Sequence, residues 1–218
     1  MGSITRSFAN NITTSGVLLP ASLTNNSIAN VTSYNAAIST GGMKLISSQT
    51  ASNSASLSFT TGIDSTYKEY QFYFIDIRSR SEPSNFFNFN LSTDGGSNYN
   101  VTKTSSSFRY YHVEDDSGTG LAYDTLPDLA QSTSNQIIGG SVGTDADQSL
   151  SGLLTLFNPS STTYVKHFIS SANAYREDDI SMAHKIAGYG NTTSAVNAIR
   201  FQFDTGNMDG TILMFGIV

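Results

Sequence analysis

The sequence predicts an all-β fold: an antiparallel, jelly-roll-like β-sandwich preceded by an extended N-terminal arm. From residue 44 onward, short runs of β-branched and aromatic residues recur at regular spacing, separated by Gly, Asn, Asp and Ser. Charged residues make up only 13% of the 218 residues, whereas Ser, Thr, Asn and Gly are abundant, which disfavours long surface helices because these need Glu, Lys and Ala. Aromatic residues make up 11%, and Phe and Tyr fill a core with few side chains.

Residues 1–42 differ in composition from the rest of the chain. Their only charged side chain is Arg6, and Gly41-Gly42 closes the segment. Apolar residues scattered among Asn, Ser and Thr favour an arm that lies extended along a groove or a neighbouring subunit; the alternative is a first strand or two of the same domain. We therefore predict a docking arm over 1–42 and a sandwich domain over 43–218. The arm residues expected to bind a partner are Phe8, Ile12, Val17, Leu18, Leu19, Leu23, Ile28 and Val31.

The sandwich domain begins with a series of predicted strands. Ala55–Phe59 alternates apolar and polar residues, which indicates one solvated face, whereas Glu69–Ile77 is apolar on both faces, as in a central strand covered on both sides. An Asp94-Gly95-Gly96 turn follows the strand at Phe87–Leu91. The other predicted strands are Leu45–Ile46, Tyr99–Thr102, Phe108–Val113, Leu153–Phe157, Tyr164–Ile169 and Met182–Ala187.

The C-terminal residues predict a β-hairpin. Ala198–Asp204 and Thr211–Val218 are strand-like, and a Gly/Asn/Asp cluster separates them. A chain that ends inside its own sheet has no tail there, so attachment is expected at the N-terminal arm. Thr125–Gln131 is the one predicted helix, of one or two turns, and residues 114–120 and 139–149 are predicted long loops.

Composition also excludes several classes of function. A net charge of −6 disfavours sequence-independent nucleic-acid binding, which depends on Lys and Arg. The absence of cysteine removes disulfides, thiolate metal sites and cysteine nucleophiles. No window approaches ~18 continuous apolar residues, and the N-terminus lacks the pattern of a signal peptide, so we expect neither a membrane-spanning nor a classically secreted chain.

Three patterns could carry chemistry, and we expect none of them to do so. Gly139–Gly143 matches the Gly-x-Ser-x-Gly turn of α/β-hydrolases around Ser141, but no amphipathic helix follows. The three histidines, His112, His167 and His184, lack a metal-site spacing. The acidic clusters 114–116, 145–147 and 177–179 lack EF-hand spacing, so solvated loop charge is the simpler interpretation. We therefore expect no catalytic residue, cofactor or metal.

Exposed tyrosines could stack on sugar rings, although core packing explains at least half of them. The candidates are Tyr110, Tyr111, Tyr164, Tyr175 and Tyr189.

Several turn and strand segments resemble small virion structural proteins of marine tailed bacteriophages, of the tail-fibre or decoration type. The segments are Ser92–Tyr99, Leu156–Thr163 and Gly206–Ile217, and the likeness covers roughly 43–218, extending more weakly through 3–34. The resemblance implies a β-sandwich carried on the virion surface and attached by its N-terminal arm to other virion proteins, such as the major capsid protein or tail proteins. It also implies a homo-oligomer, for which we expect a trimer.

The expected function is therefore that of a non-enzymatic virion structural protein, a capsid decoration or cement protein. The first alternative is a short tail fibre or receptor-binding protein that contacts host surface glycans; the absence of an internal repeat disfavours it. The second alternative is a glycan hydrolase or esterase that acts through Ser141 or a pair of carboxylates.

Overall fold

The computed structural model describes residues 42–80 and 83–218. The predicted arm, except Gly42, lies outside the described residues, and so do all eight of its predicted binding residues, from Phe8 to Val31. Their role remains a prediction from the sequence.

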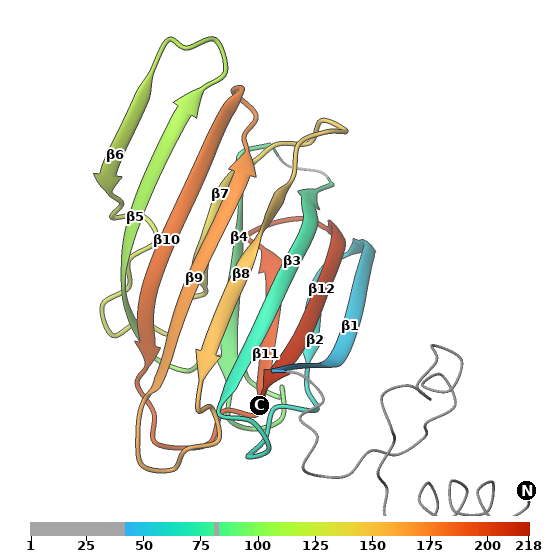
Figure 1. The fold of residues 1–218 in the computed structure, drawn as a ribbon, viewed down its shortest axis with the longest axis vertical. Coiled ribbons are helices and arrows are strands. Elements are labelled where there is room, and N and C mark those ends of the chain that lie inside the picture. The colour runs from blue at the N-terminus through green and yellow to red at the C-terminus, as the bar shows by residue number, and fades with distance from the viewer. Residues whose placement is uncertain (1–41, 81–82) are drawn as a thin grey trace, which may run out of the picture. The chain divides into compact units, whose positions relative to one another are not determined.

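The described residues form two antiparallel sheets packed as a sandwich, which confirms the predicted fold class (Figure 1). In order across the large sheet, its eight strands are β1 (Met43–Ser54), β12 (Met208–Ile217), β3 (Glu69–Ser79), β8 (Leu150–Phe157), β9 (Lys166–Tyr175), β10 (Ile180–Gly190), β5 (Lys103–Val113) and β6 (Thr119–Tyr123). The small sheet consists of β2 (Leu57–Phe59), β11 (Ala198–Phe203), β4 (Asn85–Ser92) and β7 (Gln136–Val142).

Eight of these strands have jelly-roll topology. Strands β1-β12-β3-β8 form half of the large sheet, β2-β11-β4-β7 form the small sheet, and the chain repeatedly crosses from one sheet to the other. Strands β5 and β6 are inserted between β4 and β7, and β9 and β10 between β8 and β11. Both insertions extend the same edge of the large sheet, which is why the two sheets differ in width (Figure 1).

Phenylalanine rings fill the space between the sheets. Phe201 of β11 is fully buried, and its ring lies 5.4 Å from Phe72 and 5.2 Å from Phe74 of β3, measured between ring centroids. Phe59 and Phe87 of the small sheet also contact the Phe201 ring, with centroid distances of 6.2 and 6.0 Å. Edge-to-face, tilted and stacked ring pairs of this kind add to the free energy gained by burying apolar area.

The predicted C-terminal hairpin is wrong, although both of its strands exist. Strand β11 pairs with β2 and β4 in the small sheet, whereas β12 pairs with β1 and β3 in the large sheet. The turn at 204–207 therefore connects the two layers, and Phe203 and Met208 on either side of it are both buried. Strand propensity and turn residues do not distinguish a hairpin from a connection between sheets.

Four other local predictions need correction. Residues 99–102 form no strand, because the chain passes there from the small sheet to the large one. Residues 125–131 form no helix; Ser105 N–H donates to Leu129 O at 2.9 Å, so this segment packs along β5. Residues 119–120 belong to β6, and residues 139–142 belong to β7 rather than to a loop.

Candidate functional site

The outer face of the large sheet, which points away from the small sheet, is the candidate site. Alternation assigns its side chains: on β3, Phe72 and Phe74 point into the core, so Tyr73 and Ile75 point outward. Strand register places Tyr73 beside Leu213 of β12 and Leu153 of β8. The large apolar and aromatic side chains on this face are Leu45, Phe215, Leu213, Tyr73, Ile75, Leu153, Phe157, Ile169, Tyr189, Phe108, Tyr110, Leu121 and Tyr123.

Many of these side chains are strongly exposed, above all on the inserted strands. Leu121 is 75% exposed and Phe108 is 52% exposed, although Phe108 and Tyr123 pack edge to face with ring centroids 5.8 Å apart. Ile169 on β9 is 53% exposed and Leu45 on the edge strand β1 is 51% exposed. Scattered exposed apolar residues are ordinary, but here many large ones share one face of a sheet, with small polar residues such as Gln71, Thr155 and Ser171 between them. A face of this composition is typical of an interaction site.

Fully charged groups are rare within this face. The rows of outward-facing residues run from Glu69 to Ile75 on β3 and across the described strands. Apart from histidine, the acidic and basic residues in these rows are Glu69 and Lys185. The two charges cancel, so the face is close to neutral.

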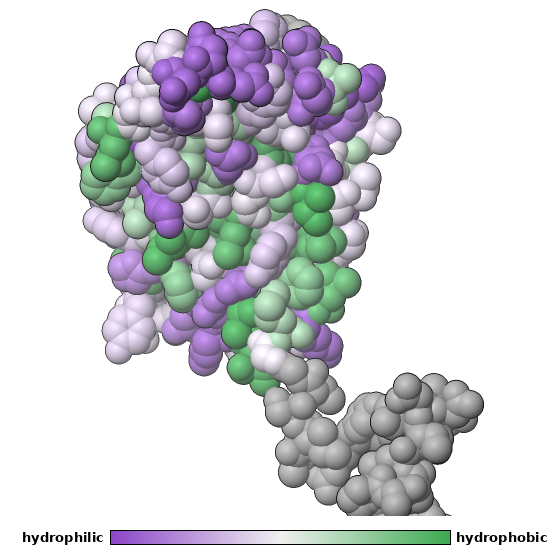
Figure 2. Space-filling model, turned by 45° about the horizontal axis from the view of Figure 1, so that its top comes forward, coloured by the Kyte–Doolittle hydropathy of each residue, from purple (hydrophilic) through white to green (hydrophobic). Residues whose placement is uncertain are grey.

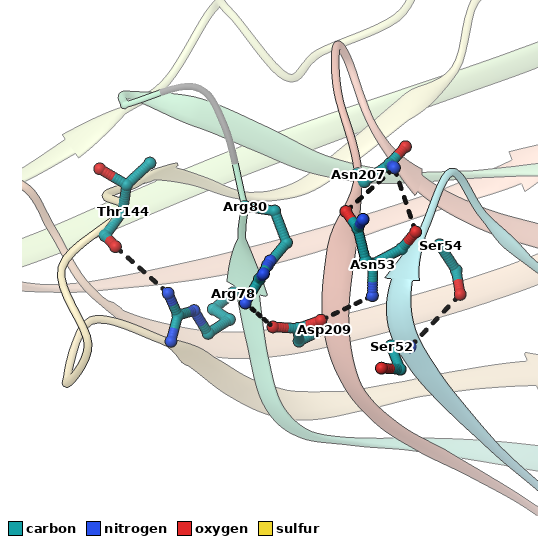
Figure 3. A network of polar contacts seen from close by, with 8 residues as sticks. All are labelled: Ser52, Asn53, Ser54, Arg78, Arg80, Thr144, Asn207 and Asp209. Atoms are coloured by element: carbon teal, nitrogen blue, oxygen red, sulfur yellow. Dashed lines mark hydrogen bonds and ion pairs between the residues drawn. The ribbon is translucent and has the colours of Figure 1, made fainter.

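One end of the sheet is polar instead (Figure 2). Bulges interrupt β1–β12, β12–β3 and β3–β8 at neighbouring positions, where Asn53, Asp76 and Gly210 adopt positive φ. At this end Asp209 accepts a hydrogen bond from Asn53 N–H at 2.7 Å and pairs with Arg80 at 3.1 Å (Figure 3). The bulges therefore mark where the apolar face ends.

A groove of about 520 Å³ lies at the other end of the strands. His167 and Tyr189 meet edge to face in it, with ring centroids 6.1 Å apart, and Phe157 and Ile169 line it further. Thr104 and Ser106 add hydroxyl groups. The groove can accept a neutral ligand that has both an apolar surface and hydrogen-bonding groups.

Two buried lysines flank Gly190 of β10 on the inner side of the sheet. In the strand register, Lys103 of β5 lies opposite Gly190 on one side, and Lys166 of β9 lies opposite it on the other side. Both lysines are 0% exposed. Lys103 Nζ donates to Asn90 Oδ1 at 2.6 Å and to Val101 O at 2.7 Å, and burial lowers its pKa to about 7. These two acceptors match the two N–H groups of a neutral amine.

Lys166 has a different set of partners. Its Nζ donates to the carbonyl oxygens of Ser161 and Tyr164, each at 2.6 Å, and of Thr192 at 3.2 Å. Burial lowers the pKa of this group as well, but the three acceptors match the three N–H groups of an ammonium. Lys166 thus links the loop before β9 to the loop after β10 by hydrogen bonds.

Ser141 lies in β7 and not in a strand-to-helix turn. Its φ of +56° belongs to a bulge, because Gly140 and Ser141 oppose the single residue Phe86 of β4. A Cβ at Gly139 would overlap Leu150, one at Gly140 would overlap the Phe86 ring, and one at Gly143 would overlap Gln148. Packing thus accounts for the glycines of this motif.

The three histidines lie apart from one another in the sheet. His167 lines the groove, and Nε2 of His112 on β5 donates a hydrogen bond to the Asp116 carboxylate at 3.0 Å. His184 is 3% exposed, its Nε2 lies 3.4 Å from Asp124 Oδ2, and burial lowers its pKa against the opposing effect of Asp124. In residues 42–80 and 83–218, no group of three or more His, Cys, Asp or Glu side chains could hold a metal ion.

Two of the acidic clusters, 114–116 and 177–179, lie in turns at the polar end of the molecule (Figure 1). Glu114 N–H donates to Asp179 O at 2.9 Å, which joins the β5–β6 and β9–β10 turns. Tyr175 donates to Asp179 at 2.9 Å, and this hydrogen bond, with a smaller contribution from burial, raises the pKa of Tyr175 to about 12. The third cluster, at 145–147, lies in the turn before β8.

The tyrosine candidates divide between the two faces of the sheet. Tyr110 and Tyr189 point outward, and Tyr189 lines the groove. Tyr111 points inward, and its ring covers Gly120 of β6. Tyr164 is 68% exposed in the loop before β9.

The outer face as a whole was not predicted, yet its signal is present in the sequence. Apolar residues occupy both parities in 69–77, 153–157 and 212–217. This pattern indicates a strand that is apolar on both faces, which the sequence predicted for 69–77 alone.

Among described residues, no helix has the length and hydropathy needed to cross a membrane. In comparisons with known proteins, no family model, curated protein or solved structure matches the chain.

Proposed function

We propose that this protein is a non-enzymatic structural protein of a bacteriophage particle, a jelly-roll sandwich displayed on the virion surface as a capsid decoration or cement protein. The observation that carries the proposal is the near-neutral apolar outer face of the large sheet, because large apolar patches on soluble proteins serve association. The resemblance of residues 43–218 to phage virion proteins supplies the biological setting.

The jelly-roll topology agrees with this proposal without selecting it. Jelly rolls occur in viral capsid proteins and in lectins, so the fold supports both an assembly protein and a glycan-binding protein. The low charge of residues 1–42 supports their role in attaching the sandwich to other virion proteins.

The attachment role can be tested with full-length chains. Leu18→Asp combined with Leu19→Asp places two carboxylates among the apolar arm residues and is expected to abolish incorporation into particles. The matched control is Thr13→Asp with Thr14→Asp, which adds the same charge at neighbouring polar positions. Incorporation is measured as copies per particle by quantitative mass spectrometry and as density by cryo-EM. Full occupancy by the leucine variant, or by residues 43–218 alone, contradicts attachment through the arm.

A second function is favoured by the groove on β8, β9, β10 and β5. Its aromatic rings and hydroxyl groups suit a sugar ring, which would make the protein a short tail fibre or receptor-binding protein for host surface glycans. Tyr189→Ala is then expected to abolish adhesion of labelled protein to host cells, whereas Tyr164→Ala, which removes an exposed tyrosine outside the groove lining, leaves it intact. Adhesion that neither substitution changes rules out this groove as the glycan site.

A further inference from the structure

We infer that the outer face of the large sheet packs against the same face of a second copy, related by a two-fold axis. The inference uses the same face that supports the proposed function, but it does not depend on virion attachment, which we propose for residues 1–42. It replaces the trimer expected from the sequence with a pair, because one face that packs on itself generates two-fold symmetry.

The size of the face suits such an interface. Eight strands at a spacing of ~4.8 Å span about 34 Å, and four rows of outward-facing side chains span about 20 Å along the strands. The product, about 700 Å², is close to the ~800 Å² that each partner contributes to a stable interface.

The charge distribution selects a second copy as the partner. The chain carries a net charge of −6, so most ways of bringing two copies together place like charges side by side. On the outer face Glu69 and Lys185 cancel, so identical faces meet without net repulsion. Acidic residues gather instead in the turns at 114–116 and 177–179, at the polar end, where they disfavour contact between copies.

The composition of the face also suits burial. Phe108, Tyr110 and Tyr123 are between 45% and 52% exposed on the inserted hairpin, and aromatic side chains are enriched in the cores of interfaces. At the centre of the sheet lie Leu153 and Tyr73, paired across β3 and β8. A second copy would bury both the inserted hairpin and the centre of the sheet, and would thereby cover a face that the small sheet does not cover.

The test is the molar mass of the purified full-length chain, measured by light scattering and sedimentation over a hundredfold range of concentration. We expect two copies per particle of solute. Leu153→Glu places a carboxylate at the centre of the face and is expected to give single copies throughout. Leu126→Glu is the matched control: Leu126 is 58% exposed but lies in the segment after β6, outside the outer face, so this variant stays paired.

A second variant avoids any effect on folding. Lys185 is exposed, so Lys185→Glu leaves the sandwich intact but changes the charge of each face from zero to −2; we expect it to weaken the pair at least tenfold. Single copies of the unmodified chain at all concentrations overturn the inference, and so does a trimer or a pair that both outer-face variants leave unchanged. The pairing test uses purified protein without virions, whereas the attachment test measures copies per particle. Each proposal can therefore fail without the other.

Discussion

The inner and outer faces of the large sheet are both apolar, but only the inner one is covered. Phe72 and Phe74 are 0% and 2% exposed, whereas Ile75 on the other side of the same strand is 42% exposed. The small sheet, which belongs to the same chain, covers the inner face around β3, and the described residues supply no cover for the outer one. Apolar residues on both sides of a strand therefore predict that both faces are covered, but they do not show whether the same chain or another chain supplies the cover.

The largest expected effect comes from removing one ring from each side of β3. Phe72→Ala leaves a cavity among Phe59, Phe201 and their neighbours, and should lower the free energy of unfolding by about 3–5 kcal/mol. Tyr73→Ala loses the contact of its ring with Phe215 and the hydrogen bond from its hydroxyl to Gln71 at 3.1 Å, both on the open face, so we expect a smaller loss of about 1–2 kcal/mol. Urea unfolding in the Leu153→Glu background, which we expect to give single copies, measures both values. Equal losses would mean that the two faces are equally buried.

Much of the fold was predictable because alternation and turn residues are local signals. The strand Ala55–Phe59 contains β2, Glu69–Ile77 lies within β3, and Met182–Ala187 lies within β10. Strand β7 was missed because Gly139, Gly140 and Ser141 resemble a loop, whereas Phe86 and Leu150 occupy the space that side chains would need. No local signal places β11 and β12 in different sheets, since that choice depends on their partners β2, β4, β1 and β3.

The candidate site was less predictable than the fold. Tyr189 was identified as a glycan candidate, but the groove around it combines Thr104, Phe157 and His167 from three other strands. The continuity of the outer face depends on strand order across the large sheet, including two inserted pairs of strands. Strand order is set by contacts between residues that are distant in sequence.

Lysines on the two faces offer the next comparison. Lys166→Met leaves the carbonyl oxygens of Ser161, Tyr164 and Thr192 without their donor, so we expect a loss of about 1–3 kcal/mol in unfolding free energy. Lys185→Met, on the outer face, changes an exposed side chain and should alter stability by less than about 0.5 kcal/mol. Chemical denaturation of both variants tests this. Indifference to Lys166→Met would show that those carbonyl groups find other donors.

Lys103 makes the inner face sensitive to pH. Burial lowers its pKa from 10.5 to about 7, so between pH 7 and 10 the unfolded chain holds a proton that the folded chain lacks. Its contribution to stability therefore rises with pH across this window, by at most about 1.4 kcal/mol per pH unit. The measurement is the urea midpoint at pH 7.5 and 9, with Lys103→Met as the control that flattens this rise. A midpoint that responds to pH identically in both proteins would exclude Lys103 as the source.

The smallest expected effect concerns the polar end of the outer face. Arg80 and Asp209 are both partly exposed, with side chains 44% and 25% accessible, so Arg80→Ala should lower stability by about 0.2–1 kcal/mol. Asp209→Ala should cost about 1 kcal/mol more, because it also removes the acceptor for Asn53 N–H in the bulge of β1. Unfolding in 1 M NaCl separates the two contributions, since salt screens the ion pair much more than it weakens the hydrogen bond. If high salt removed the effects of both substitutions alike, the bulged end would depend on charge alone, and its contrast with the apolar face would be electrostatic rather than structural.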